Sequence, residues 1–287
     1  MKNTFLVLSL SALLITSCKL GGNSSSSTPA VTHIQSDAAF KTSAVLWQQT
    51  SAEYEALCLQ AYAIAEDRIR NPQPIAADDG YVYESTVNDG GMNAIIMDLD
   101  ETVFDNSLYH GYLILENREY SKETWNNWVN REEATLIPGA YNFIMTALEL
   151  SIPIFYVSNR DFSTINATLN NLRKFNINVE EDQLLLKDVG LGMTNDKLSR
   201  FEKVERQYNV LLYIGDNLND YKIRTFGSQN ITNRKASINE MRQHIGRDFI
   251  LLPNPVYGDW EEALKVEDNK ARQNAEKNAT RYLKRFD

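Results

Sequence analysis

Short apolar runs alternate with amphipathic stretches through the middle of the chain. The apolar runs lie at residues 93–100, 152–159, 209–216 and 248–254, with a further candidate strand at 183–189. Runs of this length are typical of strands that are buried on both faces. Apolar residues at helical spacing fill the intervals at 138–150, 161–175 and 195–208. Because buried strands alternate with helices, the sequence predicts an α/β fold with a Rossmann-like parallel sheet flanked by helices.

Three segments fall outside this alternation. Residues 36–75 have helical spacing and end in Asn-Pro-Gln-Pro, which predicts one or two amphipathic helices. Residues 105–137 form an insertion that is rich in Tyr and Trp, and residues 261–287 have the pattern of a charged helix. We expect 36–75 and 261–287 to pack into a small helical cap beside a core of residues 76–260.

The N-terminus has the pattern of an exported protein. Residues 1–17 contain a basic start and an apolar run, as in a signal peptide. Cys18 follows two small residues, an ending that resembles the bacterial lipobox, in which this cysteine becomes lipidated. Residues 18–35 are rich in Gly and Ser and fit a flexible tether. The expectation is a lipid anchor at Cys18, and the alternative is an ordinary signal peptide with an incidental cysteine.

Charge and cysteine content narrow the function classes. The formal net charge of the 287-residue chain is −9, and no basic stripe is visible. Binding to a nucleic-acid backbone is therefore not expected, whereas small anionic substrates remain compatible because they respond to local charge. Cys58 lies in an apolar-periodic segment, and no histidine is near it in the sequence. We expect Cys58 to be a small buried side chain and not a thiol catalyst.

Acidic residues gather where the predicted strands end. Asp98, Asp100 and Glu101 directly follow the first apolar run. Crowded acids beside a core repel one another and are costly to desolvate, so something must compensate them. A calcium EF-hand loop does not fit, because the glycine at its sixth position and the glutamate at its twelfth are missing.

Polar residues also follow the other predicted strands. They are Ser158, Asn159 and Arg160 after the second run, Asp216 and Asp220 after the run at 209–216, and Lys197 at the start of the preceding helix. In parallel sheets, sites form beyond the carboxyl ends of the strands. We therefore expect these side chains to meet at one edge of the sheet.

This constellation resembles the haloacid-dehalogenase-like phosphotransferases, and among them the class C acid phosphatases, which are bacterial outer-membrane lipoproteins with four aspartates. The stretches IMDLDETVFDNSLY and VLLYIGDNLNDY match the two family signatures, with Met97, Phe104 and Tyr221 as mild departures. The resemblance covers residues 40–265, and the lipobox agrees with it independently.

The resemblance implies a Mg²⁺ site and a covalent mechanism. Asp98 and Asp216 would bind the metal by their side chains, Asp100 by its backbone carbonyl, and Asp220 directly or through water. Asp98 would attack phosphorus to give an aspartyl-phosphate. Asp100 would act as general acid and base, and the crowded carboxylates would suit an acidic optimum.

Ser158 would donate to a phosphoryl oxygen, and Lys197 would offset negative charge. Each assignment has a structural alternative. Asp100 could cap a helix, Ser158 could simply end a strand, and Asp220 could be an ordinary acid at a helix start. Lys187 competes with Lys197 for the pocket. For Asn159 and Arg160 we expect supporting contacts and no catalytic role.

Trp125 and Tyr257 match positions at which similar family members stack a nucleoside base. Flat aromatic rings can bind any base, so 5′-nucleotides become candidate substrates. The alternative is that Trp125 belongs to the core of the cap and Tyr257 anchors a loop. A broad phosphomonoesterase is expected otherwise.

The leading functional hypothesis is a Mg²⁺-dependent acid phosphatase, anchored by lipid in the outer membrane, that acts on small phosphomonoesters such as nucleoside monophosphates. One alternative is a phosphotransferase that passes the phosphoryl group to an alcohol. Another is a binding or adhesion lipoprotein without activity, which the intact set of six polar residues disfavours. The sequence suits a monomer and a homodimer equally.

Overall fold

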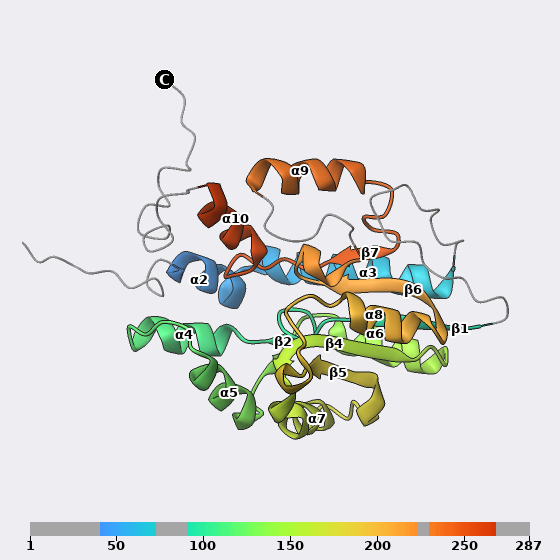
Figure 1. The fold of residues 1–287 in the computed structure, drawn as a ribbon, viewed down its shortest axis with the longest axis horizontal. Coiled ribbons are helices and arrows are strands. Elements are labelled where there is room, and N and C mark those ends of the chain that lie inside the picture. The colour runs from blue at the N-terminus through green and yellow to red at the C-terminus, as the bar shows by residue number, and fades with distance from the viewer. Residues whose placement is uncertain (1–40, 73–90, 223–229, 268–287) are drawn as a thin grey trace, which may run out of the picture. The chain divides into compact units, whose positions relative to one another are not determined.

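The computed structural model describes residues 41–72, 91–222 and 230–267. The helices are α2 (Thr42–Thr50), α3 (Ala52–Arg70), α4 (Ser107–Leu115), α5 (Lys122–Arg131), α6 (Ala140–Glu149), α7 (Ile165–Arg173), α8 (Leu198–Glu205), α9 (Ile231–Glu240) and α10 (Asp259–Glu267) (Figure 1). The strands are β1 (Met92–Met97), β2 (Phe104–Asp105), β3 (Thr135–Leu136), β4 (Ile154–Asp161), β5 (Leu184–Lys187), β6 (Tyr208–Gly215) and β7 (Phe249–Leu251). Short 3₁₀ turns lie at Phe162–Thr164, Glu181–Gln183, Val189–Leu191 and Leu218–Asp220.

Five parallel strands form the central sheet, in the order β5-β4-β1-β6-β7. Strand β1 lies in the middle, and its residue Ile95 pairs with Ile154 of β4 and Leu212 of β6. Parallel neighbours need connections that cross the sheet, and helices make these connections here. The predicted parallel sheet and all five of its predicted strands are confirmed.

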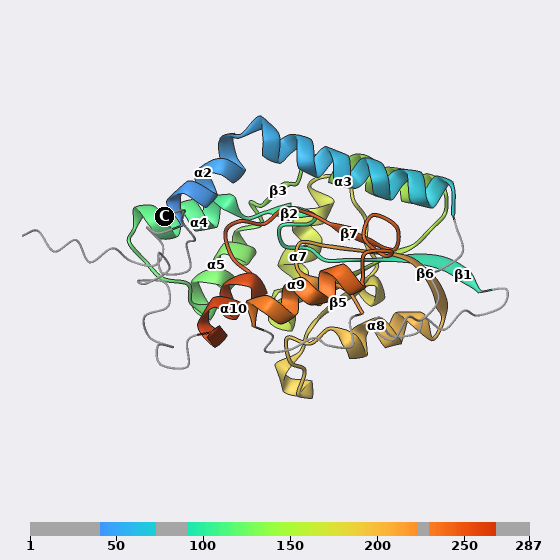
Figure 2. The ribbon, with the colours of Figure 1, turned by 90° about the horizontal axis from the view of Figure 1, so that it is seen from above.

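Successive residues of each strand enter two different cores. In β1, Ile95 and Met97 join the larger core, and Ala94 and Ile96 join the smaller one. Helices α3, α6 and α7 contribute to the larger core, and α8 packs on the other face together with residues of α9 (Figure 2). Because helices cover both faces, the strands need apolar residues at every position, which explains their unbroken apolar runs.

Helix α3 is part of this core. Its N-terminus is capped by Ser51, whose side chain accepts a hydrogen bond from the Tyr54 amide. Tyr54, Cys58 and Tyr62 are buried and belong to the larger core, so α3 does not form a body separate from the sheet. The buried position of Cys58 is confirmed. The domain boundaries drawn from the sequence stay a prediction.

The aromatic-rich insertion folds as two helices between two short strands. Strands β2 and β3 pair antiparallel, Phe104 opposite Leu136, and close the insertion at its base. Between them run α4 and α5, and α5 begins with a capping box of Ser121 and Thr124. Helix α5 also packs against α7, so the insertion is joined to the main core.

Several sequence predictions fall partly or wholly outside the described residues. These are the signal segment 1–17, Cys18 and its tether, and the C-terminal segment from residue 268 onward. Of the helix predicted at 261–287, residues 261–267 are described and lie in helix α10, which begins two residues earlier than predicted, at Asp259. Within the described ranges, no helix combines the length and the apolar character that crossing a membrane requires.

Candidate active site

The carboxyl ends of β1 and β6 lie side by side and deliver two acids to one place. The Asp98 amide donates to the Ile214 carbonyl at 2.9 Å, so Asp98 still follows the sheet register as β1 ends. The chain then turns sharply, with the Val103 and Phe104 amides both donating to the Leu99 carbonyl. This turn returns the chain toward β2 and leaves the Asp98 side chain at the edge of the sheet.

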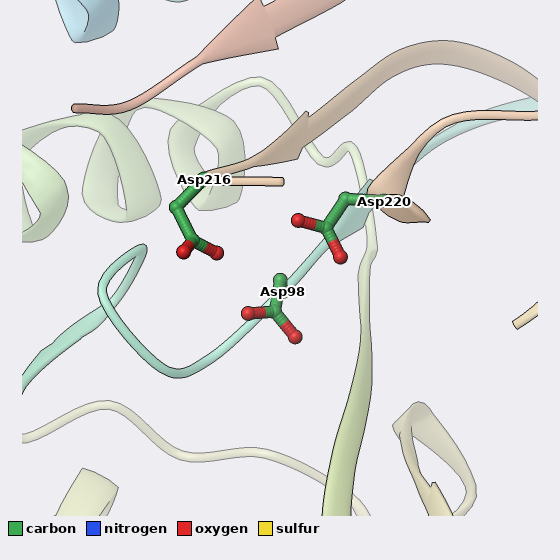
Figure 3. Close-up of side chains that lie close together, drawn as sticks. All are labelled: Asp98, Asp216 and Asp220. Atoms are coloured by element: carbon green, nitrogen blue, oxygen red, sulfur yellow. The ribbon is translucent and has the colours of Figure 1, made fainter. Parts of the chain in front are cut away.

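Asp98, Asp216 and Asp220 point toward one another from these two strand ends (Figure 3). Each offers a carboxylate oxygen, and the three oxygens lie within 4.8 Å of one another. Asp220 reaches back over Gly215, where a Cβ atom would overlap the Asp220 side chain. Glycine at position 215 is therefore a condition for the arrangement.

Lys197 sits among these acids. It is the N-cap residue of α8, and its Nζ lies 2.5 Å from Asp98 Oδ1 and 2.6 Å from Asp220 Oδ1. Lys187 instead donates to Asn195 Oδ1 at 2.9 Å. Of the two lysines considered from the sequence, Lys197 is therefore the one in contact with the aspartates.

Burial and repulsion disfavour ionised carboxyl groups at this position. Burial raises the pKa of Asp98 to about 7, with Lys197 opposing the shift and Asp220 adding to it. The pKa of Asp216 is also raised, by burial and then by the neighbouring Asp220 and Asp98 carboxylates. Burial alone would lower the pKa of Lys197, but the two carboxylates it contacts raise it, so the lysine stays protonated.

The donor set fits a divalent cation. When all are ionised, the three carboxylates and the Lys197 ammonium group sum to a net charge of −2. One divalent cation would balance this charge. Carboxylate oxygens are ligands that Mg²⁺ prefers. A bound cation would offset the repulsion among these acids and part of the cost of their burial, which together raise the pKa of Asp98 and of Asp216. The residues present therefore fit a metal of this type.

The Asp100 side chain takes a different direction. Its carboxylate accepts from Arg160 Nη2 at 2.7 Å and from Asn106 Nδ2 at 3.0 Å, and Ser158 Oγ lies 3.5 Å away. It caps no helix with these contacts, and its oxygens are not part of the group formed by the other three aspartates. The Asp100 side chain is therefore separate from the acid cluster, and metal binding through the Asp100 backbone carbonyl stays a prediction.

Ser158, Asn159 and Arg160 lie within the last residues of β4, which extends to Asp161 and not to residue 159 as predicted. Ser158 is fully buried and accepts from the Arg160 amide at 3.2 Å. Arg200 of α8 donates to the Ser158 carbonyl at 2.6 Å and to Asn159 Oδ1 at 2.7 Å. The end of β4 is thus held from α8.

Asp220 combines two roles that the sequence left as alternatives. Its Oδ2 accepts from the Asn217 amide at 2.8 Å, which closes the turn at the end of β6. Its Oδ1 contacts Lys197. One side chain therefore both stabilises a turn and contributes to the acidic site.

Glu101 has a function that sequence reasoning missed. It is fully buried and accepts from the Asn106 amide at 2.9 Å and from the Tyr257 hydroxyl. Burial, and then the nearby Asp100 carboxylate, raise the pKa of Glu101 to about 8. Its backbone is left-handed (φ 54°), and no feature of the sequence indicates that conformation.

Asn254 is a second residue that the sequence analysis missed. Its Nδ2 donates to Asp216 Oδ2 at 2.7 Å, and its own Oδ1 accepts from the Val256 and Tyr257 amides. The loop after β7 is thereby attached to the acidic site. The position of Asn254 just past a strand end was the available signal.

A cavity of about 570 Å³ opens above the acids. Its wall includes Trp125 and Tyr257, the two aromatics expected to stack a base. The edge of Tyr109 meets Trp125 at a centroid distance of 5.1 Å, and His110 lies 5.0 Å from the Tyr257 ring. Trp125 also packs against the core, and the Tyr257 hydroxyl is anchored at Glu101, so both rings line the cavity while serving as structural contacts.

The sequence and the fold were compared with known proteins. Residues 4–260 match the family described as HAD superfamily, subfamily IIIB (Acid phosphatase). The structure resembles the class C acid phosphatase from Bacillus anthracis, with 29% sequence identity, a TM-score of 0.73, and coverage of 88% of this chain and 99% of that chain. For the same enzyme with tungstate bound, the identity is 28%, the TM-score 0.74, and the coverage 87% and 99%.

A curated relative, the stem 31 kDa glycoprotein of Glycine max, is 27% identical over 161 residues, or 54% of this chain. The match spans 62% of the length of that relative. Together, these comparisons confirm the expected fold and the resemblance to class C acid phosphatases.

Proposed function

Because this chain belongs to subfamily IIIB of the HAD superfamily, the acid phosphatases, we propose that it hydrolyses phosphomonoesters with a divalent metal and a covalent intermediate on Asp98. The family and the solved class C enzymes indicate a phosphomonoesterase. One observation carries the mechanism: two buried aspartates, Asp98 and Asp220, and the half-buried Asp216 converge beside Lys197 in the wall of a cavity.

The side chains of Asp98, Asp216 and Asp220 would hold the metal, together with the Asp100 backbone carbonyl. Bound there, Mg²⁺ would supply positive charge that neutralises the phosphoryl oxygens and orients the ester. Lys197 would add a further charge beside Asp98 and the phosphoryl group, and the Ser158 hydroxyl would donate to a phosphoryl oxygen.

In the first step, an Asp98 carboxylate oxygen attacks phosphorus and forms a P–O bond. The ester P–O bond breaks, and its electron pair goes to the leaving oxygen, which takes a proton from Asp100. In the second step, Asp100 takes a proton from water as the water oxygen attacks phosphorus. The bond to Asp98 then breaks, which releases inorganic phosphate and restores both carboxyl groups.

We propose 5′-nucleotides among the substrates. The support is the aromatic wall above the acids, with Trp125 and Tyr257 on the same cavity. Stacking on such rings binds any base and is worth about 1–3 kcal/mol per base. A volume of about 570 Å³ is within the usual range for small-molecule sites.

We also propose that the protein is exported and attached to the outer membrane through lipidated Cys18. The support is the sequence alone: a signal-like segment, a lipobox-like cysteine and a Gly/Ser-rich tether. Release of phosphate and nucleosides for uptake is the role that this location suggests.

The test is hydrolysis of p-nitrophenyl phosphate and a 5′-nucleotide at acidic pH, with Mg²⁺ and with a chelator. Wild type is compared with Asp98→Asn. We expect activity only for wild type with metal. Phosphate transfer to an added alcohol at the expense of hydrolysis would identify a phosphotransferase. A folded, metal-loaded wild type with no activity would refute the proposal and favour a binding lipoprotein.

A further inference from the structure

Arg160 is a buried arginine whose side chain is held by hydrogen bonds and by aromatic rings. Only 2% of its surface is exposed. Its Nη2 donates to Asp100 Oδ1 at 2.7 Å, and its Nε lies 3.0 Å and 3.2 Å from the two Asp100 oxygens. Its Nη1 donates to Thr168 Oγ1 at 3.2 Å. Burying a charged arginine is costly, and its hydrogen bonds offset that cost. Most of these hydrogen bonds go to the Asp100 carboxylate.

Aromatic side chains fix the plane of the guanidinium group. Its Cζ lies 4.7 Å from the centre of the Phe104 ring and 6.0 Å from that of Trp125. Arginine commonly stacks on aromatic faces in this way. Trp125 belongs to α5, so Arg160 joins the aromatic-rich insertion to the end of β4.

Two further hydrogen bonds connect α5 with the Asp100 carboxylate. Trp128 of α5 donates from Nε1 to Asn106 Oδ1 at 2.8 Å, and Asn106 donates from Nδ2 to Asp100 Oδ1 at 3.0 Å. Asp100 is therefore held from two sides, by Arg160 and by Asn106. A carboxylate with this many directional contacts has little rotational freedom.

We propose that Arg160 is a positioning residue that holds the Asp100 carboxyl group in the orientation for proton transfer to the leaving oxygen. This inference rests on the proposed function, in which Asp100 is the general acid. The planar guanidinium engages both carboxylate oxygens and so fixes the plane of the carboxyl group. A lysine at this position would keep the charge but offer a single point of contact.

The role has a signature that a merely structural residue would lack. A sugar alkoxide leaves poorly unless it receives a proton, so its ester depends on a well-placed general acid. p-Nitrophenolate is a stable anion and leaves without a proton. Misplacing Asp100 therefore slows phosphoryl transfer to Asp98 from the sugar ester much more than from the nitrophenyl ester, whereas a general structural defect slows both transfers alike. The second step, in which Asp100 acts as base, is common to both esters, so the comparison is made on kcat/KM, which reports only the steps up to release of the alcohol.

The experiment measures kcat and KM of the full-length protein with Mg²⁺ for ribose 5-phosphate and p-nitrophenyl phosphate. Ribose 5-phosphate has no base, so stacking on Trp125 does not affect the comparison. We expect Arg160→Lys to lower kcat/KM for ribose 5-phosphate by about 10-fold to 100-fold, part of the typical general-acid contribution of 10²–10⁴. The loss of kcat/KM for p-nitrophenyl phosphate stays several times smaller.

The matched control is Arg68→Lys. Arg68 of α3 pairs with Asp248 just before β7, at the end of the sheet opposite the cavity, and we expect both substrates to keep their rates. If Arg160→Lys does not fold, Thr168→Val takes its place in the test. This variant removes the hydrogen bond from Arg160 Nη1, and we expect the same difference between the two substrates, of smaller size. Equal losses of kcat/KM for both substrates in an active, folded variant would overturn the inference. An inactive wild type would instead refute the proposed function.

Discussion

The ammonium group of Lys197 lies 2.5 Å from Asp98 Oδ1, 99 residues away in the sequence. It bridges to Asp220 at 2.6 Å, so one cation serves acids from two strand ends. All three side chains are at least nine-tenths buried. Removing one partner of such a buried group leaves charge uncompensated, which is strongly destabilising.

Lys197→Met is therefore expected to affect both stability and activity. Without metal, the free energy of unfolding at neutral pH should fall by about 3–5 kcal/mol. With metal, kcat/KM should fall about 10²–10³-fold, as for loss of one charge-stabilising donor. Denaturant unfolding and p-nitrophenyl phosphate hydrolysis measure the two effects. Lys187→Met is the control and should change stability by no more than about 0.5 kcal/mol. If the two variants behaved alike, the assignment of Lys197 would be wrong.

Gly215→Ala is expected to displace Asp220. The added methyl group would occupy the space of the Asp220 side chain, so the turn after β6 must shift. Overpacking of this kind costs about 1–3 kcal/mol, and a displacement near 1 Å in a catalytic group can cost about 10²-fold in rate. Thermal unfolding and kcat measure both. Gly111→Ala is the control, because Gly111 is helical and its Cβ would meet its nearest neighbour at 3.5 Å. Full activity of Gly215→Ala would contradict the close approach.

The stability of the metal-free protein is expected to fall as the pH rises through the range set by Glu101. The pKa of Glu101 is about 8 in the folded protein and 4.5 for an ordinary glutamate, so the folded state binds the proton more tightly. Stability is complete below the unfolded pKa and declines between about pH 4.5 and pH 8. At about 1.4 kcal/mol per pKa unit, this buried group accounts for roughly 4–5 kcal/mol.

Glu101→Gln removes that titration. The variant should be less stable than wild type at pH 5, since the amide satisfies fewer contacts, but its stability should depend less on pH. Urea unfolding in chelator at several pH values measures this. Parallel profiles for the two proteins would exclude Glu101 as the source, leaving Asp98, with a pKa of about 7, as the next candidate.

Trp125 and Tyr257 are expected to respond differently to substitution. Trp125→Leu removes a stacking surface and should raise KM for a 5′-nucleotide about 5-fold to 100-fold, as loss of base stacking predicts. KM for p-nitrophenyl phosphate should change far less. Tyr257→Phe keeps the ring but removes the hydroxyl that anchors it to Glu101. It should lower stability by about 1–3 kcal/mol with a smaller effect on nucleotide KM. A nucleotide KM unaffected by Trp125→Leu would argue against the stacking proposal.

The sequence by itself determined the sheet and the chemical character of its edge. Strands buried on both faces require unbroken apolar runs, and residues just past parallel strands must share one edge, so Asp98 and Asp216 could be placed together from the sequence alone. The helices could be predicted because apolar residues recur along them with a period of about 3.6 residues.

Only the tertiary structure decided the partners. Two lysines fitted the sequence pattern, and the position of α8 selects Lys197. Asp100 turns to Arg160, and Glu101 meets Tyr257 from 156 residues away. Local sequence carries no information on such pairs, because a buried charge is satisfied by whichever group the packed elements bring within about 3 Å.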